Sequence, residues 1–219
     1  MNRPAMPHAK NIARTAPRTA FLTMLAALAA PLALAACSPG GDAGKPDLAT
    51  APLAGARIGG DFALTDKDGN TVRWSDFAGQ WRIAYFGYTF CPDVCPVDAA
   101  AIGQGLSLLE KEAPELGASV TPIFVTVDPA RDTPEVVGEF AANFHPRMVG
   151  LTGSEEDVAA AAKKFVVWFE AGEPGENGGY LVSHTNQTVL FDPDGNPVAL
   201  LPTDQGGKAV AQELAKWVR

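Results

Sequence analysis

The chain has 219 residues, of which 47% are apolar, so it is long enough to bury one core of ordinary domain size. The first 36 residues hold four of the 17 basic residues and none of the 25 acidic ones, so the rest of the chain carries a formal charge of −12. Such an acidic surface repels the phosphate backbone of nucleic acids. We therefore expect no nucleic-acid partner and favour cationic partners or metal ions.

The N-terminus predicts an export signal. Two arginines at positions 14 and 18 precede an apolar run over residues 21–34, which is too short and too broken by Pro31 to predict a membrane span. The run ends in LAAC (residues 34–37), which resembles the lipobox of bacterial lipoproteins and makes Cys37 the lipidated residue. Ordinary cleavage after an Ala-x-Ala sequence, which would leave a soluble protein, is the alternative. We predict a signal peptide over residues 1–36, a lipid anchor in a bacterial membrane and a domain that faces the periplasm, where disulfides can form.

Residues 37–56 are rich in Ala, Gly, Pro and Asp and predict a flexible tether. The remaining residues, 57–219, predict one domain with alternating strands and helices. The strands are expected at residues 58–64, 71–74, 81–88, 120–127, 149–152, 165–169, 188–192 and 197–201. The helices are expected at residues 98–112, 133–143, 154–164 and 206–218. This pattern predicts an α/β fold with a mixed central sheet, helices on both faces and an N-terminal β-hairpin.

The sequence also predicts the roles of several individual side chains and of one loop. Trp74, Trp81, Trp168 and the phenylalanines are interpreted as core. Residues 171–179 form a Gly-rich and Glu-rich loop that we expect to be mobile. Asp128, Arg131 and Asp132 fit turn and helix-cap chemistry, which explains these residue types without any ligand role.

Cys91 and Cys95 are the only cysteines in the predicted domain. They follow a strand and precede a helix, where free backbone N–H groups stabilise a thiolate. The pair could form a structural disulfide, a redox-active dithiol or part of a metal site. With three residues between them, regular helix geometry leaves their Cβ atoms about 5–6 Å apart, which is more than the roughly 3.8 Å of a disulfide. A disulfide therefore needs an irregular loop, which Pro92 favours, whereas the extra room suits a metal ion.

Two histidines lie beyond the predicted signal peptide. Two thiolates alone suit a soft ion such as Cu(I), whereas Cu(II) or Zn(II) needs a further ligand. His145 follows a predicted helix, and we interpret it as a surface or capping residue. His184 follows the predicted mobile loop and is the candidate third ligand, with a purely structural role as the alternative.

Several ordered blocks of the chain resemble the Sco (SenC/PrrC) family of copper chaperones, which belongs to the thioredoxin-like superfamily. The blocks are FGYTFCPDVCP (residues 86–96), VDPARDTP (127–134), GLTG (150–153), YLVSHT (180–185) and LFDPDG (190–195). The resemblance covers about residues 58–218. It implies a thioredoxin-like fold and a copper site made by Cys91, Cys95 and His184. Ser183 and Phe90 depart from the family pattern, because members often carry an acidic residue and a histidine at these places.

The resemblance also implies a function. The protein is expected to deliver copper, as Cu(I) or Cu(II), to the copper-bearing subunit of cytochrome c oxidase, where it would metallate the binuclear copper centre. Other periplasmic copper carriers or thiol reductases are further expected partners. Oxidation of Cys91 and Cys95 to a disulfide would abolish copper binding, so the thiol state is expected to gate the site. The loop over residues 171–179 is expected to bring His184 toward the cysteines or release it.

An enzymatic reading stays open beside the chaperone. Cys91 and Cys95 would then be the redox pair of a thiol–disulfide oxidoreductase that acts on exported or oxidase cysteines. The Trp-Cys-x-x-Cys motif of exported reductases is missing, and residues 185–188 contain no proline before the hairpin strand. A peroxidase lacks its own motif here, and a zinc site would need a fourth ligand such as His145.

Overall fold

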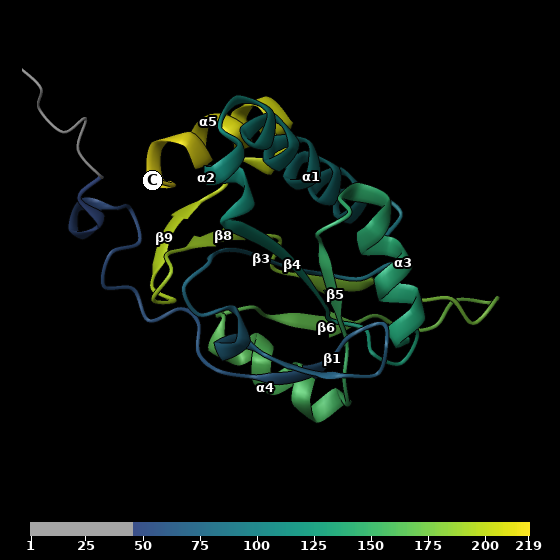
Figure 1. Ribbon diagram of the computed structural model, residues 1–219. Coiled ribbons are helices and arrows are strands. Elements are labelled where there is room, and N and C mark those ends of the chain that lie inside the picture. Colours follow the sequence, from purple (N-terminus) through teal and green to yellow (C-terminus); the bar gives the residue numbers. More distant parts are fainter. Residues whose placement is uncertain (1–45) are drawn as a thin grey trace, which may run out of the picture. The chain divides into compact units, whose positions relative to one another are not determined.

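A five-stranded mixed sheet forms the centre of the computed structural model, which describes residues 46–219 (Figure 1). The strand order is β5-β4-β3-β8-β9. Strand β3 pairs in parallel with β4 and antiparallel with β8, so the predicted mixed sheet is confirmed. The strands are β3 (Trp81–Gly87), β4 (Val120–Thr126), β5 (Val149–Leu151), β8 (Thr188–Phe191) and β9 (Pro197–Leu200).

Helices cover both faces of this sheet, as predicted. Helices α1 (Val94–Glu112) and α5 (Gly207–Trp217) pack against each other on one face, and α4 (Glu155–Lys164) lies on the other face beside β1 (Figure 1). Helix α3 (Pro134–Phe144) packs against β5 and contacts α1, and α2 (Pro114–Ala118) joins α1 to β4. Among the helices of residues 46–219, none combines the length and apolar character that crossing a bilayer requires.

The N-terminal hairpin is confirmed, although its first strand is shorter than predicted. Strands β1 (Ala63–Thr65) and β2 (Thr71–Arg73) pair antiparallel across a turn, where Asp66 Oδ1 accepts hydrogen bonds from the N–H groups of Asp68 and Asn70. The predicted strand over residues 165–169 is wrong. Phe165 caps α4, and Val166 has a φ of 57°, so the chain turns sharply before a strand can form.

Strand β6 (Phe169–Ala171) instead begins where the predicted strand ends, and it pairs with β7 (Val182–His184) in a separate two-stranded sheet. The exposed loop over residues 172–179 lies between these two strands. Three short 3₁₀ helices complete the described chain: η1 (Leu48–Thr50), η2 (Trp74–Phe77) and η3 (Thr203–Gln205).

The packed chain begins before the expected boundary at residue 57. Ala51 is buried, and the N–H of Leu53 donates a hydrogen bond of 3.0 Å to the carbonyl of Val198 in β9. Residues 48–53, which we expected to lie in the tether, therefore lie against the domain. The predicted signal peptide, Cys37 and the first part of the tether lie outside the described residues.

Two of the residues expected in the core are exposed. Trp74 and Trp81 are buried, as predicted, but Trp168 and Phe90 are 57% and 54% exposed. The reason is their position, because Phe90 lies in the loop after β3 and Trp168 precedes the small sheet of β6 and β7. Phe90 directly precedes Cys91, and the backbone of Trp168 is hydrogen-bonded to Thr185, the residue after His184.

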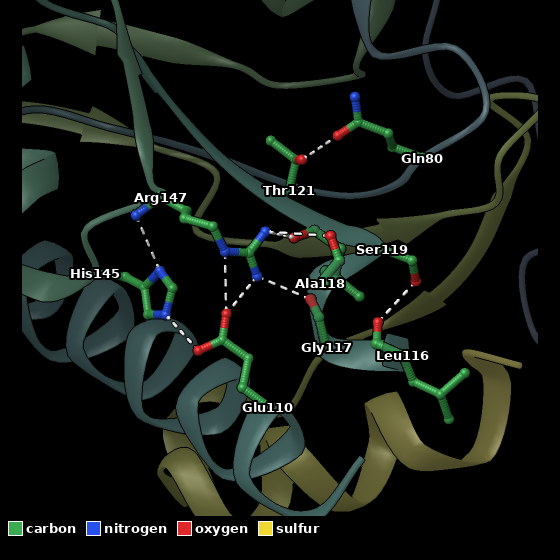
Figure 2. A network of polar contacts seen from close by, with 10 residues as sticks. Gln80, Glu110, Leu116, Gly117, Ala118, Ser119, Thr121, His145 and Arg147 are labelled. Carbon is green, nitrogen blue, oxygen red and sulfur yellow. Dashed lines mark hydrogen bonds and ion pairs between the residues drawn. The ribbon is translucent and has the colours of Figure 1, made fainter. Parts of the chain in front are cut away.

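A polar cluster at the C-terminal end of α1 joins four elements and explains His145 (Figure 2). His145 Nε2 lies 3.3 Å from Glu110 Oε2, and its Nδ1 accepts a hydrogen bond from the N–H of Arg147. The guanidinium of Arg147 binds Glu110 and donates to the carbonyls of Gly117 and Val120. The interpretation of His145 as a surface residue is wrong, since it is only 3% exposed, whereas its place at the C-cap of α3 fits the capping alternative.

Candidate metal centre

The end of β3 determines how closely the thiol of Cys95 approaches the sheet. Gly87 is the last residue of the strand, and a Cβ atom added there would lie 3.1 Å from Cys95 Sγ and 3.2 Å from the ring of Phe124. Both contacts are tighter than most Cβ contacts in a close-packed interior, so a side chain at this position would require its neighbours to shift. Glycine at this position therefore lets the thiol of Cys95 approach the backbone of β3.

Asp132 anchors the loop that leads from β3 to Cys91. Its carboxylate accepts hydrogen bonds from the backbone N–H and the hydroxyl of Thr89, at 3.0 and 2.6 Å, and from the hydroxyl of Thr126 at 2.5 Å. Asp132 is fully buried. These three bonds fix the loop relative to the end of β4, which is a structural duty, as we predicted for this residue.

Cys91 precedes α1, and Cys95 lies in the first turn of this helix. Cys91 precedes the helix in an irregular segment, and its Sγ accepts a hydrogen bond of 3.5 Å from the N–H of Cys95. Both cysteines are free thiols here, with Cys91 half-buried and Cys95 fully buried. The irregular segment that a disulfide would need at Pro92 is therefore present.

His184 reaches the same place from β7. Its Nε2 lies 3.3 Å from Cys95 Sγ, and its Nδ1 lies 3.0 Å from the carbonyl oxygen of Thr185. A carbonyl only accepts hydrogen bonds, so Nδ1 must carry a proton and donate it. The neutral ring then presents the lone pair of Nε2 to the thiol, which is the tautomer that a metal ligand needs. The ring of Tyr88 stands edge-on to the imidazole, with centroids 5.9 Å apart.

The two thiols differ in acidity. Partial burial disfavours the thiolate of Cys91, but hydrogen bonds from the N–H groups of Cys95 and Asp93, and from the side chains of Cys95 and Tyr88, outweigh it and lower its pKa. Burial raises the pKa of Cys95 to about 12, and the neighbouring Cys91 adds to the effect. Cys91 is therefore the more reactive thiol, and Cys95 holds its proton.

A buried tyrosine and a buried carboxylate lie behind Cys95. The hydroxyl of Tyr85 donates to Asp98 Oδ2 at 3.1 Å, and both residues are at most 5% exposed. Burial, together with the nearby Cys95 and Asp98, raises the pKa of Tyr85 far above its ordinary value. The phenol thus stays neutral beside the thiol.

Asp128 and Arg131 connect the Cys91 loop to the segment before His184. Asp128 accepts hydrogen bonds from Arg131 Nε at 2.6 Å and from the hydroxyl of Tyr180 at 2.7 Å. The guanidinium of Arg131 stacks 3.6 Å from the ring centroid of Tyr180 and 4.9 Å from that of Phe90. We interpret this cluster as structural, because it joins two loops and contacts neither cysteine.

The structure thus brings Cys91, Cys95 and His184 to one place, and it leaves His145 at the other end of α1. Within residues 46–219, no three His, Cys, Asp or Glu side chains already converge around one point as a closed metal cluster. The contacts are pairwise, from Cys91 to Cys95 and from Cys95 to His184. Sequence reasoning did not single out Tyr85, Tyr88 or the carbonyl of Thr185, because their roles depend on the pairing of β3 and the course of the chain after β7.

The chain is similar in sequence to known proteins. The SCO1/SenC family model matches residues 50–219. The mouse mitochondrial protein SCO2 homolog is 41% identical over 172 residues, which cover 78% of this chain and 65% of that protein. The SenC protein of Rhodobacter capsulatus is 43% identical over 140 residues, which cover 64% of this chain and 61% of that protein. The chain thus spans less than two thirds of the length of either relative.

Solved structures agree with the family match. Arabidopsis thaliana ScoI, crystallised with copper bound, has a TM-score of 0.68 and 34% identity, covering 74% of this chain and 98% of that one. Yeast Sco1 with copper bound has a TM-score of 0.65 and 36% identity, covering 72% of this chain and 86% of that one. The predicted thioredoxin-like fold is confirmed by these neighbours. The chain belongs to the SCO1/SenC family.

Proposed function

We propose that this protein binds copper through Cys91, Cys95 and His184 and delivers it as cargo to a cytochrome c oxidase. The contact of 3.3 Å between His184 Nε2 and Cys95 Sγ carries the proposal, because it places an imidazole lone pair beside a thiol in a protein with few other soft donors. Two sulfurs and one imidazole nitrogen form a donor set that suits Cu(I). Relatives crystallised with copper support this choice of metal.

Loading requires the cysteines to lose their protons, because thiolates and not thiols bind metals. Cys91 loses its proton the more readily of the two, since its pKa is lowered, and Cys95 follows as the metal binds. The hydrogen bond to the carbonyl of Thr185 keeps the ring of His184 in place during this step. Three ligands leave one side of a bound ion open to a partner's ligands, so transfer proceeds by ligand exchange.

The thiol pair provides a redox gate for the site. Thiol–disulfide exchange with an oxidised partner dithiol would join Cys91 Sγ to Cys95 Sγ, with two electrons and two protons passing to the partner's disulfide. Both sulfurs would then lose the negative charge that holds copper. The irregular segment before α1 allows the two sulfurs to approach, since Cys91 lies outside the helix.

The location follows from the N-terminal sequence. LAAC (residues 34–37) favours a lipid on Cys37 and a domain held at the periplasmic side of a bacterial membrane. The oxidase subunit that carries the binuclear copper centre is the proposed recipient. Labelling with a radioactive fatty acid, compared between the natural chain and a Cys37→Ser variant, tests the anchor directly.

A copper titration tests the central proposal. The reduced protein is titrated with Cu(I) and with Cu(II), in parallel with Cys95→Ser and His184→Ala variants and with His145→Ala as the matched control. We expect one copper per chain, loss of binding in Cys95→Ser, weaker binding in His184→Ala and unchanged binding in His145→Ala. Equal binding in all four proteins contradicts the proposed site.

A thiol–disulfide oxidoreductase is the second candidate, and the difference in acidity between Cys91 and Cys95 favours it. A thiol with a lowered pKa attacks a disulfide, and a buried neighbour resolves the mixed disulfide. Catalytic reduction of oxidised glutathione by a chain that binds no copper supports this enzyme and contradicts the chaperone.

A further inference from the structure

A pocket of about 380 Å³ lies beside the candidate metal centre and plays no part in holding the metal. One wall belongs to α1, one turn after Cys95, and another belongs to the segment that follows His184. The pocket thus touches both segments that carry proposed ligands. Its lining includes Asp98, Asn186, Gln187, Thr188, Leu200 and Asp204.

Thr188 supplies a hydroxyl without a partner in this pocket. It is only 2% exposed, and its Oγ1 is one of two buried side-chain polar atoms within residues 46–219 that lack a hydrogen-bond partner. Thr188 pairs with Tyr85 across β8 and β3, so both side chains lie on the face of the sheet that α1 covers. A buried hydroxyl without a partner costs free energy, so a polar group that reaches it from the pocket gains a hydrogen bond without displacing another.

Two carboxylates border the same pocket without a cationic partner. Asp98 is 5% exposed, and of its two carboxylate oxygens only Oδ2 accepts a hydrogen bond, from the hydroxyl of Tyr85. Neither Asp98 nor Asp204 takes part in a salt bridge within the described part of the chain. A nearly buried carboxylate without a positive neighbour makes the pocket a site for a cation.

We infer that this pocket receives an arginine side chain of the protein that docks at the metal centre. A guanidinium has five N–H donors in one plane and sheds water more easily than an ammonium, which fits a pocket of carboxylates, side-chain amides and a free hydroxyl. Leu200, Leu201 and Pro202 offer apolar walls for the methylene stem. A divalent metal ion fits less well, because no cluster of three metal-binding side chains exists in residues 46–219.

This inference rests on the proposed function, because the protein that docks is the proposed recipient of the copper. An arginine in the pocket touches α1 just after Cys95 and the chain just after His184. The partner's surface is thereby held against the two chain segments that carry Cys95 and His184. The same contact selects partners with a basic residue beside their own copper ligands, which agrees with the −12 charge of the chain from Cys37 onward.

A titration followed by amide NMR tests the pocket in the full mature chain. The probe is N-acetyl-arginine methylamide, and its neutral isostere, the citrulline derivative, is the matched control. We expect saturable shifts at the amides of Gln187, Thr188 and Thr203 with the arginine probe only, weakening as salt rises. We expect the dissociation constant to rise about two- to fivefold in Asp204→Asn, because an exposed ionic partner is lost.

Thr188→Val provides a second variant that keeps the shape of the side chain. Valine removes the unpaired hydroxyl and suits a strand, so we expect the fold to persist while guanidinium binding weakens. Shifts that are equal for arginine and citrulline, or unchanged binding in both variants, overturn the inference, and so does selective binding of Mg²⁺ or Ca²⁺ at these amides. A natural chain that binds arginine but no copper contradicts the proposed function and leaves the arginine pocket in place.

Discussion

The two ends of α1 each meet a histidine, and the two histidines have different surroundings. At the C-terminal end, His145 has Glu110 at one ring nitrogen and the N–H of Arg147 at the other, so both nitrogens are bound within the fold. At the N-terminal end, only Nδ1 of His184 has a backbone partner, and Nε2 faces the thiol of Cys95. The partner of the second ring nitrogen, a carboxylate for His145 and a thiol for His184, therefore separates the structural histidine from the proposed ligand.

Of these changes, His184→Ala should have the largest effect on copper binding. It removes one of three proposed ligands, so we expect Cu(I) affinity to fall by more than about 100-fold, beyond the range for losing an outer-shell partner. The free energy of unfolding should change by less than about 1 kcal/mol, because the side chain is only partly buried and one hydrogen bond to Thr185 is lost. Competition with a Cu(I) chelator and urea unfolding of the copper-free protein measure the two quantities. If the variant is much less stable but keeps the Cu(I) affinity of the natural chain, His184 has a structural role and is not a ligand.

His145→Ala should give the opposite result. The change removes a ring that is only 3% exposed, together with its contacts to the N–H of Arg147 and to Glu110, so unfolding should become easier by about 1–3 kcal/mol. Copper affinity should stay within about twofold of the natural chain, because this cluster lies at the far end of α1. A fall in copper affinity as large as that of His184→Ala contradicts the assignment and revives His145 as a ligand.

The sequence predicted the cysteine pair and His184 because each lies in a short block whose order resembles the family. It also predicted the central sheet, since β3 and β4 are continuous runs of buried residues. It could not separate His145 from a surface residue, because Glu110 and Arg147 lie 35 residues upstream and two residues downstream of it, and only packing brings them together. The strand expected at residues 165–169 failed for a local reason, the left-handed backbone of Val166, which a β-branched residue rarely adopts.

The pH dependence of copper binding tests the difference between the two thiols. Burial holds the pKa of Cys95 at about 12, so this thiol keeps its proton across the neutral range and must release it when copper binds. Cys91 has a lowered pKa, so it carries a proton only at more acidic pH. There, copper binding must release a second proton, from Cys91. We expect the apparent affinity to rise about tenfold per pH unit above the pKa of Cys91, and more steeply below it. Chelator competition at several pH values measures the slope, and a flat profile excludes the thiolate of Cys95 as a ligand.

The smallest effect concerns acid stability at the structural end of α1. Partial burial disfavours the charge of Glu110, but its bonds to Arg147 and His145 outweigh this and lower its pKa below the ordinary 4.5. A depressed carboxyl pKa stabilises the fold above the unfolded pKa, and the contribution is lost as the pH falls through the lower, folded pKa. The gain is below about 1 kcal/mol, because the side chain is one third exposed and water screens the pair. In Glu110→Gln, the free energy of unfolding in urea should therefore fall less steeply as the pH drops from about 5 to about 3, the range in which a carboxyl group titrates. The same variant should bind copper like the natural chain, and an unchanged acid limb would show that Arg147 is held by its backbone carbonyl partners alone.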